Sequence, residues 1–184
     1  LGAALATAAP ASADETITTS GPLTTITISP YLNCAVTYLG DSSPEFYAAT
    51  ACGTFVSAAG VLYGPSSVPA GSGATGVTGY TAYTPVSQTP VSGAGTAADP
   101  YSVTTVVALG TSGLTVTEVD SYTVGRDDYR TSITLSAAAG TSAVDAIIYH
   151  AADCYLQSSD AGLGAVQNGN APLCKALPGS ADPN

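Results

Sequence analysis

Charged side chains are scarce in this chain. They make up 9% of its 184 residues, whereas soluble domains usually carry about 25%. Three Lys and Arg stand against 13 Asp and Glu, which gives a formal net charge of −10. Nucleic acids and anionic membrane surfaces attract positive charge, so this balance disfavours both as partners. We expect solubility to come from hydroxyl groups rather than from ion pairs.

Long apolar runs are missing as well. No segment approaches the roughly 18 consecutive apolar residues that a membrane-spanning helix requires, so we predict no membrane span. Residues 1–13 are apolar and uncharged and end in Ala11-Ser12-Ala13, the small-x-small pattern of a secretory cleavage site. We interpret them as the end of a secretory signal peptide, with an Ala-rich linker as the alternative. The protein is therefore expected to be secreted, either extracellular or associated with the cell surface.

The cysteines form an even set of two clusters, Cys34 with Cys52 and Cys154 with Cys174. In an exported chain this favours disulfides over thiol chemistry or zinc. A zinc site would need all four sulfurs, because His150 is the sole histidine and no CxxC pair occurs. Three connectivities are possible, and the clustering favours the local one, Cys34 to Cys52 and Cys154 to Cys174.

Along the body of the chain the hydrophobic pattern has a period of two, and β-branched residues dominate. In the first third of the chain we expect strands at 23–28 and 34–39 and a hairpin over 54–63. Four strand-like runs with short breaks between them follow in the second half, at 101–109, 114–124, 129–137 and 143–150. Breaks of this length are typical of hairpins, so these runs predict a four-strand antiparallel meander.

The remaining segments contain little hydrophobic periodicity. Residues 68–99 are rich in Gly, Pro, Ser and Thr and are expected to form long loops with at most edge strands. No helix is expected. The fold class is therefore all-β: an antiparallel β-sandwich with a four-strand meander and long Gly/Ser/Pro-rich loops. We assign residues 14–152 to this sandwich, and 153–184 to an irregular C-terminal segment or linker held by the second disulfide.

The second run of the meander changes phase. Leu114 and Val116 share one face of the strand, whereas Val119 falls on the other, and a β-bulge near Thr117-Glu118 would explain this. Glu118 and Asp120 lie two apart and hence on one face, where a glycosidase pair or a calcium site is one interpretation. A solvated strand edge is the alternative. In the same way, Asp153 and Asp160 are either turn residues or ligands of a bound Ca²⁺.

No catalytic or cofactor-binding signature is convincing. A Ser-His-Asp device would have to use His150, with Asp145 or Asp153 orienting it, but no G-x-S-x-G elbow occurs. We expect His150 to make a structural hydrogen bond at a strand end. Residues 71–76 match G-x-G-x-x-G by letters, yet no helix follows to hold a pyrophosphate. We therefore predict no enzyme activity, no catalytic residues, no cofactor and no metal ligands.

Tyrosine is the aromatic residue of this chain: Tyr occurs 11 times, Phe twice and Trp not at all. Its rigid amphipathic ring is common in binding hot spots and stacks on sugars. We predict a binding surface that includes Tyr80, Tyr83, Tyr122 and Tyr155. The alternative is that the tyrosines pack in the core in place of the missing Trp.

One stretch resembles a known group of proteins. DPYSVTTVVALGTSGLTVTEVDSYTVGRDDYRTSITLSAAAG is followed by AIIYHAADCYLQSSDAGLG, and YLGDSS, ACGTF and LYGP precede it in that order. The chain is similar, over about residues 33–165, to a domain near the N-termini of actinobacterial secreted and cell-surface proteins. The resemblance implies an extracellular β-sandwich, often continued by further β-strands, and it implies no catalytic residues.

Two functions remain open from the sequence. We expect a non-catalytic extracellular surface, structural or adhesive module that acts by contact with other protein surfaces or by self-association. Uncharged hydroxyl and tyrosine groups supply hydrogen bonds and apolar area for such contacts. The alternative is a secreted carbohydrate-binding or carbohydrate-active domain that uses the acidic pair and the tyrosines, with glycans as partners.

Overall fold

The computed structural model describes residues 13–72, 79–156, 159–160, 162–169 and 171–176. Within these ranges the chain is all-β, with 13 strands in four sheets and no α-helix. None of the described residues belongs to a helix with the length and hydrophobicity of a membrane span. Residues 1–12, which carry most of the expected signal peptide, and residues 73–78 of the glycine-rich segment lie outside the described residues.

One of the two four-stranded sheets is an antiparallel meander with strand order β10-β9-β8-β7. Its members are β7 (Thr84–Gln88), β8 (Tyr101–Ala108), β9 (Leu114–Tyr122) and β10 (Arg130–Ala137). Along β9 every second residue is buried, as expected for a sheet with one covered face. We call it the main sheet.

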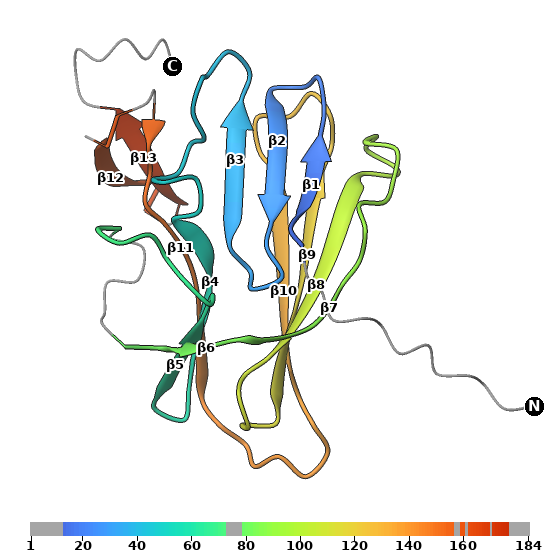
Figure 1. Cartoon of the computed structure of the whole chain (residues 1–184), viewed down its shortest axis with the longest axis vertical. Helices are drawn as coiled ribbons and strands as arrows, with labels where there is room; N and C mark the ends of the chain where they lie inside the picture. The colour runs from blue at the N-terminus through green and yellow to red at the C-terminus, as the bar shows by residue number, and fades with distance from the viewer. Residues whose placement is uncertain (1–12, 73–78, 157–158, 161, 170, 177–184) are drawn as a thin grey trace, which may run out of the picture.

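Two further sheets cover the main sheet. The N-terminal sheet has the antiparallel order β1-β2-β3, and the lateral sheet has the order β11-β4-β5-β6, in which the β5–β6 pair alone is parallel. The strands of the N-terminal sheet are β1 (Glu15–Thr18), β2 (Leu23–Ile28) and β3 (Cys34–Tyr38). Those of the lateral sheet are β4 (Cys52–Ala58), β5 (Val61–Gly64), β6 (Thr81–Ala82) and β11 (Ala146–Ala152). In Figure 1 the N-terminal sheet lies in front of the main sheet, and β4 and β5 lie to its side.

The hydrophobic core has two parts, which lie at opposite ends of the β8–β9 pair. One part joins the N-terminal sheet to Val103 and Tyr122 of the main sheet. The other joins β4 and β5 to Val107 and Val116. In the β8–β9 register, the pair Thr105–Glu118 lies between these two parts. The junction of the two core parts is therefore occupied by polar residues of the main sheet.

The structure confirms the all-β class with antiparallel sheets, but it corrects the membership of the meander. Three of the four expected strands form β8, β9 and β10, and the fourth member is β7. The strand expected at 143–150 forms as β11 and pairs with β4 instead. There Ile148 lies opposite the buried Val56. The connection between β10 and β11 is long enough to reach another sheet, so hairpin pairing was not obligatory.

The expected β-bulge near Thr117 is wrong. Strand β9 pairs with β8 and with β10 in unbroken register. The phase of the hydrophobic pattern changes because Glu118 and Asp120 occupy buried positions on the core face, where the sequence pattern would place apolar residues.

The C-terminal segment also differs from expectation. Strands β12 (Gly162–Gln167) and β13 (Ala171–Ala176) form a two-stranded antiparallel sheet in a segment that was expected to be irregular. Leu163 and Val166 are exposed there, so this sheet does not show the alternating apolar pattern by which a half-buried strand is recognised. Strands β6 and β7, within the loop-rich segment 68–99, lie at the edges of their sheets.

Both expected disulfides are present. Cys34–Cys52 joins β3 to β4 with a Cα–Cα distance of 4.9 Å, and Cys154–Cys174 joins the segment after β11 to β13 with a Cα–Cα distance of 6.3 Å. The first connects the N-terminal sheet to the lateral sheet beside the backbone bridge between Asn33 and Gly53. Two disulfides are consistent with an oxidising environment.

We predict that the two disulfides contribute unequally to global stability. They close loops of similar length, 18 and 20 residues, for which loop entropy alone gives about 3 kcal/mol each. Replacing Cys34 and Cys52 with Ser should lower the free energy of unfolding by about that amount. Replacing Cys154 and Cys174 should cost much less, because the β12–β13 sheet can detach without opening the core. Urea denaturation measures both, and equal losses would contradict this account.

Candidate functional site

Two carboxyl groups lie inside the protein on the core face of β9. Glu118 is 2% exposed and Asp120 is 1% exposed. Backbone pairing with β8 on one side and β10 on the other fixes the position of both residues in the main sheet. Because strand residues two apart share a face, both side chains point toward the covering sheets at the junction of the two core parts.

Thr54 of β4 reaches Glu118 from the opposite layer. Its side chain is fully buried, and its Oγ1 donates a hydrogen bond to Oε2 of Glu118. The Thr54 backbone is also held on both sides: its N–H donates to the Leu32 carbonyl at 3.2 Å, and its carbonyl accepts from the Tyr83 hydroxyl at 3.1 Å. A Cβ on the preceding Gly53 would lie 2.8 Å from the Leu32 carbonyl oxygen. Glycine is therefore required for this close approach.

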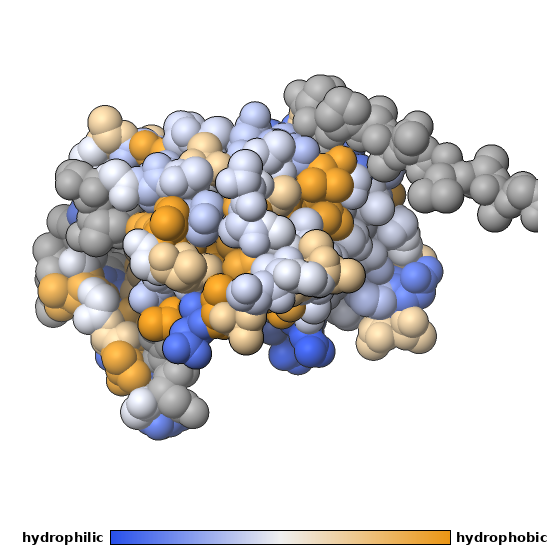
Figure 2. All heavy atoms as spheres, turned by 90° about the horizontal axis from the view of Figure 1, so that it is seen from below, coloured by the Kyte–Doolittle hydropathy of each residue, from blue (hydrophilic) through white to orange (hydrophobic). Residues whose placement is uncertain are grey.

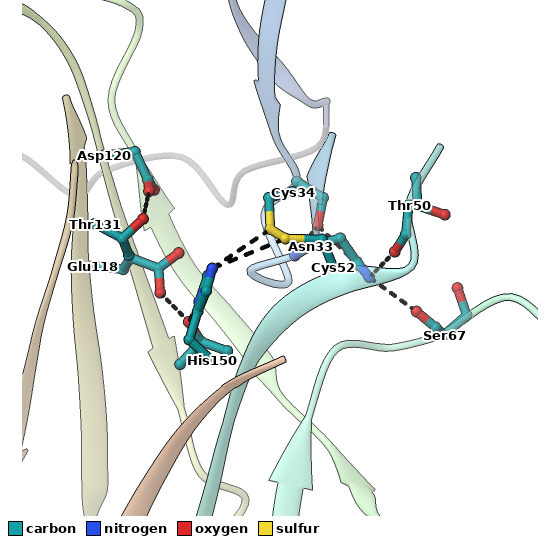
Figure 3. Close-up of a disulfide and its surroundings, with 11 residues drawn as sticks. Asn33, Cys34, Thr50, Cys52, Ser67, Glu118, Asp120, Thr131 and His150 are labelled. Carbon is teal, nitrogen blue, oxygen red and sulfur yellow. Dashed lines mark hydrogen bonds between the residues drawn. A yellow bond between two sulfur atoms is a disulfide. The ribbon is translucent and has the colours of Figure 1, made fainter. Parts of the chain in front are cut away.

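His150 completes a chain of contacts from the edge strand β11. It lies opposite Thr54 in the β11–β4 register, and its Nδ1 is 3.1 Å from Thr54 Oγ1. Its Nε2 is 3.9 Å from the Sγ atoms of both Cys34 and Cys52, as Figure 3 shows. A disulfide sulfur carries no hydrogen and can only accept. The proton of a neutral His150 is therefore assigned to Nε2, which leaves the Nδ1 lone pair facing the Thr54 hydroxyl.

The two carboxyl oxygens of Asp120 differ in their hydrogen bonding. Its Oδ1 accepts a hydrogen bond from the Thr131 hydroxyl at 2.7 Å, whereas its buried Oδ2 has no hydrogen-bond partner within the described part of the chain. An ionised carboxylate with an unpaired buried oxygen is costly. The environment therefore disfavours charge on Asp120.

The electrostatics of the site favour uncharged groups throughout. Burial raises the pKa of both Glu118 and Asp120, and the nearby Asp120 carboxylate raises the pKa of Glu118 further. Burial lowers the pKa of His150 and raises the pKa of the Tyr83 hydroxyl. At neutral pH the hydroxyl of Thr54 thus meets a neutral carboxylic acid and a neutral imidazole.

The burial of these groups limits what they can do. A glycosidase pair must flank a sugar bond that reaches both carboxyl groups, but Glu118 and Asp120 are closed off inside the molecule. Cys34, Cys52 and His150 bring two sulfurs and a ring nitrogen within 4.8 Å of one another. The two sulfurs are joined to each other, so they offer no thiolate to a metal.

The four tyrosines expected to form a binding surface differ in burial. Tyr83 and Tyr122 are 3% and 1% exposed, so the expectation is wrong for these two. The Tyr122 hydroxyl donates to the Arg126 carbonyl at 2.9 Å and accepts from the Leu23 N–H at 3.3 Å. These tyrosines supply core volume in a chain without Trp.

The other two tyrosines are half-buried and contact different partners. The ring of Tyr80 packs edge-on against Phe55 with centroids 5.8 Å apart, and that of Tyr155 packs against Tyr47 at 6.2 Å. The expectation of an exposed binding surface thus applies to these two rings at most.

Other expected residues lie outside this site. Asp153 and Asp160 both line a small cavity of about 170 Å³ beside the second disulfide. The sequence did not single out Thr54. Nothing distinguishes it from the many other threonines until the packing of the lateral sheet against the main sheet is known. His150 is expected at a strand end, but β11 continues to Ala152, so His150 lies within the strand. Its contacts with Thr54 and the disulfide become visible through the β11–β4 register.

Comparisons with protein-family models, curated proteins and solved structures gave no match. The function must therefore be argued from the site and the surface of this chain.

We predict that the buried Glu118 makes stability fall on the alkaline side when Thr54 is replaced by Val. The hydrogen bond from Thr54 lowers the pKa of Glu118, so its removal leaves burial and Asp120 to raise it. An unfolded Glu ionises at about pH 4.3. Between that pH and the raised pKa of the folded state, the folded chain therefore binds more protons than the unfolded chain does. The free energy of unfolding should then fall by up to about 1.4 kcal/mol per pH unit.

The measurement is urea denaturation of Thr54→Val from about pH 7 to about pH 9, above the range in which a His with a lowered pKa titrates. Thr54→Val combined with Glu118→Gln is the matched control and should give a flat profile. The same slope in both variants would assign the pH dependence to another group.

Proposed function

We propose that this chain is a non-catalytic, extracellular β-sandwich module that works by protein contact, with a second copy of itself as the partner. The packing of the main sheet against the N-terminal and lateral sheets supports the sandwich. The observation that carries the function is the exposed, uncharged edge strand β11. Within the described residues it has a strand neighbour on one side alone, β4.

Strand β11 lacks the devices that usually protect a sheet edge. Natural edge strands carry Lys, Pro, inward-pointing charges or bulges that block pairing with another chain. Strand β11 reads AIIYHAA, pairs with β4 without a bulge and contains no charged residue or proline. Its backbone is therefore a template for strand addition, in which main-chain hydrogen bonds supply affinity.

The side chains of β11 add apolar area on both faces. Ile147 is 57% exposed, Ile148 40% and Tyr149 45%. Ile148 lies on the face of the buried Val56, and Ile147 and Tyr149 lie on the other face. A strand added at this edge would bury side chains above and below the sheet.

The rest of the surface also favours contact through uncharged groups. Figure 2 shows one end of the molecule, where hydrophobic side chains lie in separate groups among polar ones. No single broad hydrophobic patch on this face suggests a contact site, so we base the proposed contact on the β11 strand edge. Within the described ranges the structure has one salt bridge, between Arg126 and Asp128 at 3.1 Å, and it is exposed. Ion pairs thus offer little for recognition.

We predict self-association that persists or strengthens in high salt. Screening weakens the mutual repulsion of molecules with a net charge of −10 and removes no ion pair that the contact needs. Light scattering in low salt and in about 0.5 M NaCl, where the Debye length is well under 8 Å, measures this. Dissociation in salt, or a monomer in all conditions, would contradict the proposal.

The matched variants locate the contact. Ile147→Lys places a charge on the β11 edge and should weaken association roughly tenfold or more, because the charge would have to be buried. Leu163→Lys on β12, where Leu163 is 51% exposed, introduces the same charge away from β11. It should associate as the unmodified chain does, and equal weakening by both substitutions would place the contact elsewhere.

A further inference from the structure

We propose that Thr54 and Glu118 condense to form an intramolecular ester, a covalent cross-link between β4 and β9 made by the folded chain itself. The proposal is independent of self-association. It rests on the contact of three groups: the Thr54 hydroxyl, the Glu118 carboxyl and the His150 imidazole. The nucleophile and the acyl group thus meet inside the protein, and the base contacts them from the exposed edge strand β11.

The fold holds the two reacting groups in contact from different sheets. Glu118 lies in the middle of β9, paired with Thr105 on β8 and with Ile133 on β10. Thr54 lies in β4, fixed through its backbone by Leu32 and Tyr83. Intramolecular reactions between groups held in this way reach effective molarities of about 10⁵ to 10⁸ M. Positioning alone can therefore supply much of the rate of an otherwise slow condensation.

Each of the three groups is in the protonation state that the reaction needs. Because burial lowers the pKa of His150, the imidazole is neutral. Its Nδ1 lone pair accepts the Thr54 proton once the hydroxyl hydrogen turns from Glu118 Oε2 toward Nδ1. Because burial and Asp120 raise the pKa of Glu118, its carboxyl is neutral and open to attack at Cδ. A carboxylate would repel the incoming oxygen. His150 acts as general base in the first step and as general acid in the second.

The reaction balances without an oxidant or a co-reactant. Thr54 Oγ1 bonds to Cδ of Glu118 while its proton moves to Nδ1 of His150. The tetrahedral intermediate then expels the carboxyl hydroxyl, which takes that proton and leaves as water. One C–O bond forms, one C–O bond breaks, and one water is released.

Burial also favours the product. Thr54 and Glu118 are 0% and 2% exposed, so the ester would be shielded from hydrolysis. His150 lies on the exposed edge strand β11, which gives the released water a route to solvent. The cross-link would tie the lateral sheet to the main sheet at the junction of the two core parts. The Cys34–Cys52 disulfide ties the lateral sheet to the N-terminal sheet at the same place.

The test is the intact mass of the folded, disulfide-bonded full chain, measured after denaturation. The unmodified chain should be lighter by one water than its sequence and two disulfides predict. Tandem mass spectrometry should assign the loss to a linked pair of peptides, one with Thr54 and one with Glu118. Hydroxylamine, which cleaves esters but not amides, should separate this pair.

Three variants make the assignment specific. Thr54→Val keeps the shape of the side chain but removes the nucleophile, and should show the full mass. His150→Ala removes the base and should show the full mass or a loss that develops much more slowly. Thr134→Val alters an exposed threonine on β10 and should retain the loss of one water.

Two results would overturn the proposal. One is a folded, unmodified chain with the full mass and no linked peptides. The other is a loss of water that persists in Thr54→Val, since the bond would then lie elsewhere. Should Thr54→Val fail to fold, the linked peptides of the unmodified chain decide the matter on their own.

Discussion

The contact between Thr54 and Glu118 is the interaction on which the arrangement of this protein depends. It joins the lateral sheet to the main sheet at the point where the two parts of the hydrophobic core meet. An isolated charge at this depth would be very costly, and burial together with Asp120 raises the pKa of Glu118 to about 8, so Glu118 is uncharged at neutral pH. The Cys34–Cys52 disulfide and His150 lie against the same contact. The covering sheets and the main sheet are thus held together by polar groups as well as by apolar packing.

The strands could be predicted from the sequence better than their partners. Alternation of apolar and polar residues identified β8, β9 and β10, because each has one covered face. Strand β11 was identified as a strand but assigned to the wrong sheet, because periodicity carries no information about the pairing partner. The hairpin of β12 and β13 was missed because its apolar residues are exposed and sparse. The disulfide pairing was predicted correctly from the clustering of the cysteines.

The candidate site could be predicted from the sequence even less well than the strand pairing. Glu118 and Asp120 were recognised as sharing a face, but the sequence suggested a solvated edge, since carboxylates are rarely fully buried. Their burial follows from the β8–β9 register, which places Glu118 between Val103 and Val107 along the core face. Thr54 and His150 join them only through the pairing of β4 with β11. For the surface, the sequence itself shows that β11 is uncharged, and the structure adds that this strand is an exposed edge, on which the proposed contact rests.

The most direct test of this account is the carboxyl carbon resonance of Glu118. The chain has three glutamates, Glu15, Glu45 and Glu118, so carbon-13 labelling of Glu gives a simple spectrum, and Glu118→Gln assigns the signal. The account predicts that this resonance stays that of an uncharged carboxyl group or ester from about pH 4 to about pH 7. A Glu118 resonance that titrates near the ordinary value of about 4.3 would show a charged carboxylate, and the neutral, buried contact between the sheets would be wrong.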